Sequence, residues 1–192
     1  MSSEEDLVRR TLSETIAIHE RVMRANLQPV LDAAAAIAES FRGGGKLLLF
    51  GNGGSAADAQ HMAAEFVGRF QRERAALAAV ARTADTSVLS SIGNDYAFER
   101  IFARQVEALG RQGDVAFGIS TSGRSPNVLA GLVTARERGL KTLALTGCDG
   151  GAIGEAADTH VNVASESTAR VQEVHRTLLH AICDLVERGL FA

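Results

Sequence analysis

Apolar side chains recur at helical spacing through the first forty residues of the chain. In residues 3–24 their spacing is roughly helical, and residues 27–42 repeat the pattern before three glycines at 43–45 end it. These two windows predict amphipathic helices. In the first window the apolar side chains form one stripe, made of Leu7, Leu12, Ile16, Ile18 and Val22. Because the later segments can form a core of their own, we expect residues 3–42 to take part in subunit contacts.

From Lys46 onward, short apolar runs alternate with longer helical windows. The runs have strand length and lack a polar face, and they lie at 46–50, 77–82, 115–120, 141–146 and 159–163. A last helix is predicted over 171–189. Apolar strands that alternate with helices are typical of a parallel sheet covered by helices on both faces. We therefore predict an α/β fold, a three-layer doubly wound sandwich with a five-stranded parallel sheet, preceded by two N-terminal helices.

Composition narrows the classes of protein that fit this fold. The chain has 192 residues, 46% of them hydrophobic, which suits one domain over 1–192 with a full core. A net charge of -3 gives no basic surface for nucleic acid. No apolar run could span a bilayer, and the charged N-terminus argues against a signal peptide. Cys148 and Cys183 lack metal spacing, so we expect free thiols in a cytoplasmic protein without nucleic-acid or membrane partners.

The segment GNGGSA at 51–56, here called the glycine loop, follows the first predicted strand and opens a helix. Its spacing matches the fingerprint of dinucleotide-binding proteins. The glycines let backbone N–H groups approach an anion, and Ser55 is expected to cap the helix. Taken alone, the glycine loop could hold a dinucleotide, a smaller phosphate, or no ligand.

The segment STSGRSP at 120–126, here called the hydroxyl loop, follows the third predicted strand. It carries four hydroxyl groups, and Pro126 fits the first turn of a helix, so the loop could form a phosphate cradle that needs no lysine. The alternative is an ordinary serine-rich turn with a helix cap. No Walker lysine follows the glycine loop, and the end of the second strand has Arg82 in place of the expected ribose-binding carboxylate. A monophosphate therefore explains more of the sequence than a dinucleotide.

Two predicted helices carry polar side chains suited to chemistry. His61 and Glu65 stand four positions apart on one face of a helix, where they could share a divalent metal, act as acid and base, or form a surface pair. Gln172 and His180 share one side of the closing helix and could bracket a ligand.

Other polar residues indicate a functional role less strongly. We interpret His19 and His160 as structural, whereas the role of His175 stays open. A turn is predicted at GND, residues 93–95, and it could cap a helix or bind sugar hydroxyls.

Six segments along the chain can be considered together: GNGGSAADAQH at 51–61, EF at 65–66, GND at 93–95, STSGRS at 120–125, TGCDGG at 146–151 and RVQEVH at 170–175, the last followed by His180. Over nearly the whole chain, these motifs resemble those of the phosphoheptose isomerases, a sugar isomerase (SIS) domain family. The resemblance implies a homotetramer with active sites at subunit contacts. It also implies conversion of sedoheptulose 7-phosphate to D-glycero-D-manno-heptose 7-phosphate through an enediolate, the first step of bacterial ADP- or GDP-heptose biosynthesis, which serves lipopolysaccharide and other glycans.

The resemblance also assigns roles to residues. It implies Glu65 and His180 as the catalytic acid/base pair, and one zinc ion per subunit held by His61, Glu65, Gln172 and His180. The substrate-binding positions that it implies are Asn52, Gly53, Gly54, Ser55, Glu65, Asn94, Asp95, Ser120, Thr121, Ser122, Ser125 and Gln172. Ala75 and Ala78 stand where other members often have prolines, so the path of that loop is open.

Two alternatives remain at this point. One is a non-catalytic SIS-domain protein that binds sugar phosphates or regulates the replication initiator; the presence of Glu65 and His180 favours an enzyme instead. The other is an isomerase of a different ketose phosphate, on which the sequence is nearly silent.

Overall fold

The computed structural model describes residues 3–191. The elements follow the predicted alternation, in the order α1 (Ser3–Arg24), α2 (Gln28–Arg42), β1 (Leu47–Gly51), α3 (Gly54–Val67), β2 (Ala79–Ala81), α4 (Thr86–Asp95), the 3-10 turn η1 (Phe98–Arg100), α5 (Ala103–Leu109), β3 (Val115–Ser120), α6 (Pro126–Glu137), β4 (Lys141–Gly147), α7 (Gly151–Ala156), β5 (Thr159–Val163) and α8 (Thr168–Leu190).

All five strands lie in one parallel sheet with the order β2-β1-β3-β4-β5. The chain runs from β1 outward to β2 and then returns to β3 on the other side of β1. The direction of winding therefore reverses between β1 and β3, and Gly51 pairs with Ile119 there. In open parallel sheets, ligands bind outside the carboxyl ends of the strands at such a switch point.

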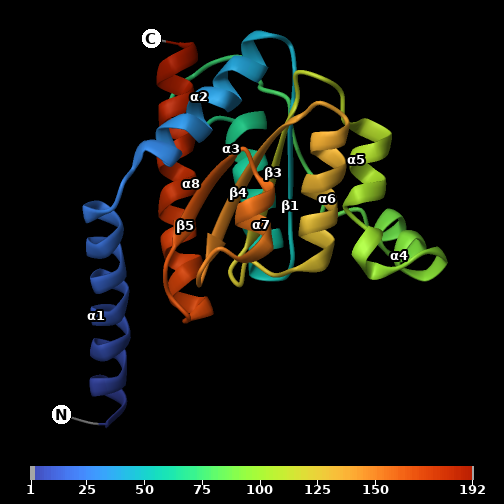
Figure 1. The fold of residues 1–192 in the computed structure, drawn as a ribbon. Coiled ribbons are helices and arrows are strands. Elements are labelled where there is room, and N and C mark those ends of the chain that lie inside the picture. Colours follow the sequence, from blue (N-terminus) through green and yellow to red (C-terminus); the bar gives the residue numbers. More distant parts are fainter. Residues whose placement is uncertain (1–2, 192) are drawn as a thin grey trace.

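Helices cover both faces of the sheet, as Figure 1 shows. One core lies between the sheet and the helices α2, α3 and α8, and the other between the sheet and the helices α5, α6 and α7. Every residue of β1 and β3 is buried, which explains why these strands lack a polar face in the sequence. The predicted three-layer, doubly wound α/β fold is confirmed.

Local predictions at two loops were wrong. Ser55 does not cap α3, because the helix already begins at Gly54 and the cap position is Gly53; Ser55 is buried in the first turn. Asn94 and Asp95 do not form a separate turn, since the preceding apolar residues extend α4 as far as Asp95. The second strand, predicted over 77–82, is shorter, Ala79–Ala81.

Helix α1 lies apart from the sheet and packs along α8, as seen at the blue end of the chain in Figure 1. Ile18 is buried, but Leu7, Leu12, Ile16 and Met23 are 54–67% exposed. An apolar stripe therefore remains uncovered within this chain. Among the described residues, no helix combines the length and the apolar character needed to cross a membrane.

Candidate active site

The glycine loop and the hydroxyl loop meet where β1 and β3 end. The side-chain amides of Asn52 and Asn127 join them, each donating to the oxygen of the other at 2.8 and 2.9 Å. Asn127 is buried, so this reciprocal pair fixes the spacing of the two loops. The sequence does not reveal Asn127, because Asn near the start of a helix usually indicates capping and this contact spans distant segments.

The hydroxyl loop gathers its side chains around one point. The Ser120 Oγ lies 3.0 Å from the Ser125 Oγ and 3.4 Å from the Ser122 Oγ. Pro126 is the first residue of α6, so the loop ends at a helix N-terminus as predicted. Thr121 is half-buried beside them. Converging hydroxyls in front of a helix N-terminus form an arrangement that can hold a phosphate group.

Two glycines allow these loops to pack closely. A Cβ at Gly54 would overlap the side-chain amide of Gln172, which places this part of α8 against the start of α3. Gly123 has φ +68°, and a Cβ there would overlap the backbone of Gly150 in the loop after β4. The glycines of both loops thus serve close packing around the predicted site.

Helices α3 and α8 bring together the predicted acid, base and metal ligands. The Nε2 atoms of His61 and His180 are 2.8 Å apart, and the His61 Nε2 lies 3.1 Å from the Glu65 Oε1. All three side chains are partly exposed, with their ligand atoms within 4.8 Å of one another. Gln172 lies instead over Gly54, about two helical turns before His180. Its part in metal binding stays a prediction.

This donor set fits a zinc ion. Two imidazole Nε2 atoms that face each other can share only one proton, so at least one lone pair points towards the common centre. Two histidines and one glutamate are a ligand set of catalytic zinc sites, in which a fourth position stays open. His61, Glu65 and His180 are therefore suited to hold the metal.

A partly buried ion pair lies beside this cluster. The Asp58 Oδ1 accepts from the Arg176 Nε at 2.9 Å and from its second guanidinium nitrogen at 2.6 Å, and Asp58 is only 3% exposed. Burial and the neighbouring His61 lower the pKa of His180. The sequence did not indicate this pair, because Asp58 and Arg176 lie on different helices and neither belongs to a recognisable spacing.

The remaining histidines make structural contacts. The His175 Nε2 donates to the Thr146 carbonyl at 2.9 Å, and burial lowers the pKa of this fully buried ring. His175 is thus a neutral core residue, which answers a question that the sequence left open. His19 contacts Thr177, and His160 contacts Thr146 through its Nε2.

Asn94 and Asp95 are not brought to the cluster within this chain. Both are exposed at the end of α4, and the Asn94 Nδ2 donates to the Asp95 Oδ1 at 2.8 Å. Helix α4 packs on the face of the sheet opposite α3 and α8. Their contact with substrate stays a prediction.

Comparisons with known proteins agree with this geometry. A family model described as "SIS domain" matches residues 12–147. A phosphoheptose isomerase of Roseiflexus sp. (strain RS-1) is 52% identical over 180 residues, which cover 94% of this chain and 91% of that protein. A phosphoheptose isomerase of Pelobacter propionicus is 51% identical over 187 residues, covering 97% and 99% of the two chains.

A solved structure of phosphoheptose isomerase from Neisseria gonorrhoeae superposes with a TM-score of 0.92 at 44% identity, covering 97% of this chain and 100% of that one. Another, from Francisella tularensis, gives 0.93 at 34% identity with the same coverage. The relatives and the two structures match nearly the full length of the chain, and the family model matches residues 12–147 of it. The chain therefore belongs to the phosphoheptose isomerases, a family of SIS-domain enzymes.

Proposed function

We propose that this protein converts sedoheptulose 7-phosphate to D-glycero-D-manno-heptose 7-phosphate. The observation that carries the proposal is the convergence of Glu65 and His180 from two helices that pack on the same sheet whose carboxyl edge bears the hydroxyl loop. A ketose phosphate needs both: an anion cradle at one end and an acid/base pair at the other. The names of the full-length relatives support the same substrate class.

Moving a carbonyl from C2 to C1 requires proton transfers that Glu65 and His180 can perform. Glu65 takes a proton from C1 of the open-chain ketose, and the electron pair of that C–H bond forms the C1–C2 double bond while His180 protonates the C2 oxygen. His180 then takes the proton of the C1 hydroxyl as the C1 carbonyl forms, and Glu65 returns a proton to C2. Both residues end in their starting states, so the cycle balances.

Zinc held by His61, Glu65 and His180, with Gln172 as the fourth predicted ligand, would supply electrostatic stabilisation of the substrate oxygens. A carboxylate bound to a metal is a weaker base, so turnover and zinc binding need separate measurements. The rest of the chain positions the substrate: the hydroxyl loop holds the phosphate, and the Asn52 and Asn127 pair holds the two loops together.

The experiment that tests this function is an isomerisation assay with zinc supplied. We expect the wild type to form an aldose 7-phosphate from sedoheptulose 7-phosphate and to turn over a shorter ketose phosphate, such as fructose 6-phosphate, far more slowly. Binding of sedoheptulose 7-phosphate without any turnover would support the non-catalytic alternative. Equal rates on both ketoses would contradict the proposed substrate.

Substitution of the hydroxyl loop should weaken substrate binding more than turnover. Ser120→Ala and Ser125→Ala each remove a hydroxyl from the cradle, and hydrogen bonds to charged groups contribute about 1.5–3 kcal/mol. We expect KM for the phosphorylated ketose to rise about 10-fold or more while kcat changes little, as happens when binding is lost equally in ground and transition states. Steady-state kinetics measures both values, and an unchanged KM would place the phosphate elsewhere.

We further propose a homo-oligomer, with the tetramer of the resembled family as the expected state. Its support is the exposed apolar stripe of α1, together with the exposure of Asn94 and Asp95, which would contact substrate in a neighbouring subunit. We place the reaction in the cytoplasm, where free Cys148 and Cys183 stay reduced, and at the start of ADP- or GDP-heptose supply.

A charge placed on the α1 stripe should dissociate this oligomer. Leu12→Asp and Ile16→Asp would each bury a carboxylate in the contact, so we expect a lower mass by light scattering coupled to size exclusion. Ala17→Asp serves as the control, because Ala17 is exposed on α1 but lies off the stripe. If all three variants keep the wild-type mass, α1 is not the contact.

A further inference from the structure

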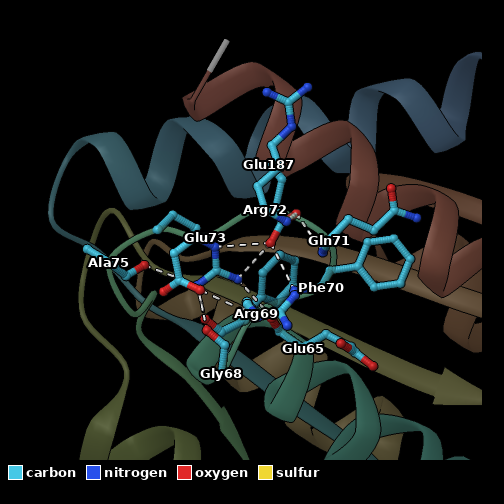
Figure 2. Close-up of polar contacts among 11 residues, drawn as sticks. Glu65, Gly68, Arg69, Phe70, Gln71, Arg72, Glu73, Ala75 and Glu187 are labelled. Carbon is cyan, nitrogen blue, oxygen red and sulfur yellow. Dashed lines mark hydrogen bonds and ion pairs between the residues drawn. The ribbon is translucent and has the colours of Figure 1, made fainter.

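A fully buried carboxylate organises the loop that follows α3. Glu187, on α8, accepts hydrogen bonds at 3.0 Å from the backbone N–H groups of Phe70, Gln71 and Arg72. Figure 2 shows its carboxylate among these residues. Burial acts to raise the pKa of Glu187, but these N–H groups and Arg74 outweigh it, and the pKa lies below its usual value. Glu187 is thus an ionised anchor for residues 68–75.

Arg74 is the partner of this carboxylate and is itself 1% exposed. Its Nε donates to the Glu187 Oε1 at 3.1 Å, and its other nitrogens donate to four backbone carbonyls. Two of these belong to the last turn of α3: the Glu65 carbonyl at 2.8 Å and the Phe66 carbonyl at 2.7 Å. The others belong to Gly68 and Ala75. The guanidinium thus caps the end of the helix that carries Glu65.

Phe70 links the same loop to the other member of the acid/base pair. Its ring stacks on the imidazole of His180, with centroids 5.5 Å apart and an interplanar angle of 29°. The His61 ring lies 5.1 Å from the same imidazole. His180 therefore contacts two rings, and the backbone N–H of Phe70 donates to Glu187. Rotation of His180 away from His61 is restricted by this packing.

We propose that Arg74, Glu187 and Phe70 are positioning residues for the acid/base pair. The Arg74–Glu187 ion pair fixes the helix end at Glu65 and, through Phe70, the ring of His180, so one anchor sets the separation of two catalytic groups from different helices. This inference rests on the proposed function for the identity of the catalytic groups. It assigns a role to a loop whose path the sequence left open at Ala75 and Ala78.

A merely structural ion pair would stabilise the fold without affecting the site, and the chain offers a matched control for that case. Asp114 is buried immediately before β3, where it accepts from the Lys46 N–H at 2.9 Å, the Lys46 Nζ at 2.5 Å and the Arg111 N–H at 2.9 Å. Like Glu187, it is a buried carboxylate held by backbone N–H groups and one cation. Asp114→Asn should therefore cost stability without disturbing His180.

The experiment compares Phe70→Leu, Phe70→Tyr, Glu187→Gln and Asp114→Asn at a temperature where all are folded. We expect Phe70→Leu and Glu187→Gln to lower kcat about 10-fold with KM within about 2-fold, because the phosphate cradle is untouched. Zinc affinity, measured by competition with a chromophoric chelator, should fall about 10-fold in both, in the range known for residues that orient metal ligands. Phe70→Tyr keeps the ring and should restore most of both losses.

The imidazole NMR signals of metal-free protein give a readout that needs neither turnover nor zinc. A single sharp set for His180 is expected in the wild type, Phe70→Tyr and Asp114→Asn, and a broadened or shifted set in Phe70→Leu. If Phe70→Leu keeps the His180 signals and the zinc affinity of the wild type, the inference is overturned. A loss of kcat in Asp114→Asn as large as in Phe70→Leu would overturn it as well. If the wild type binds zinc but does not isomerise sedoheptulose 7-phosphate, the proposed function is wrong. The positioning of His180 would then still be tested by the NMR signals.

Discussion

Replacing Glu65 by glutamine is expected to lower kcat for sedoheptulose 7-phosphate by about 10²–10⁴-fold while the protein stays folded. Glutamine has the same shape but cannot take a proton from carbon. His180→Gln should have an effect of similar size, because the oxygens then lose the group that donates and accepts their protons. Steady-state kinetics with zinc supplied measures the loss, and circular dichroism checks the fold.

The double variant sharpens this expectation. If Glu65 and His180 act as one unit, the kcat of the double variant Glu65→Gln/His180→Gln should be about that of the slower single variant. It should not fall by the product of the two single losses. Multiplicative losses would indicate that the two residues act in independent steps. Near wild-type kcat in either single variant would remove that residue from the acid/base pair.

Replacing Glu187 by glutamine is expected to lower the free energy of unfolding by about 3–5 kcal/mol at pH 7, since it leaves the buried Arg74 without its counter-charge. The side-chain NH₂ of glutamine would also face backbone N–H groups that now donate to a carboxylate. Urea unfolding of wild type and variant measures the difference.

The same carboxylate predicts a pH dependence. Its pKa is lowered in the folded state, so its contribution to stability is complete above the ordinary value of about 4.5 and is lost as the pH falls towards the folded value. The stability difference between wild type and Glu187→Gln should therefore be constant from about pH 7 to pH 5 and should narrow below about pH 4.5. A difference that grows on acidification would mean that the folded pKa is raised.

The fold was largely predictable from the sequence because its strands are apolar on both faces and are separated by helices of ordinary length. β1 and β3 are buried along their whole length, and this feature is what distinguishes a covered parallel sheet from an open one. The ends of the helices were less predictable where apolar residues continue past a turn motif. That is why Asn94 and Asp95 belong to α4, and why Ser55 lies inside α3 rather than at its cap.

The candidate site was predictable only where its residues share one loop or one helix. The spacing of His61 and Glu65 and the hydroxyls of the hydroxyl loop are local features, and the structure brings each group together. Glu187 stands more than a hundred positions after the loop that it holds, so no local pattern connects them. Asn127 and Asp58 were missed for the same reason, because each contacts its partner only after the helices pack.

Proton transfer by Glu65 and His180 between C1 and C2 of a ketose 7-phosphate can be followed directly by NMR. The experiment is a time course of sedoheptulose 7-phosphate with zinc-supplied wild type and with Glu65→Gln, side by side. We expect aldose 7-phosphate signals to appear with the wild type and to stay absent with the variant over the same period. Absence of aldose with the wild type, or its formation at the same rate with Glu65→Gln, would contradict this expectation.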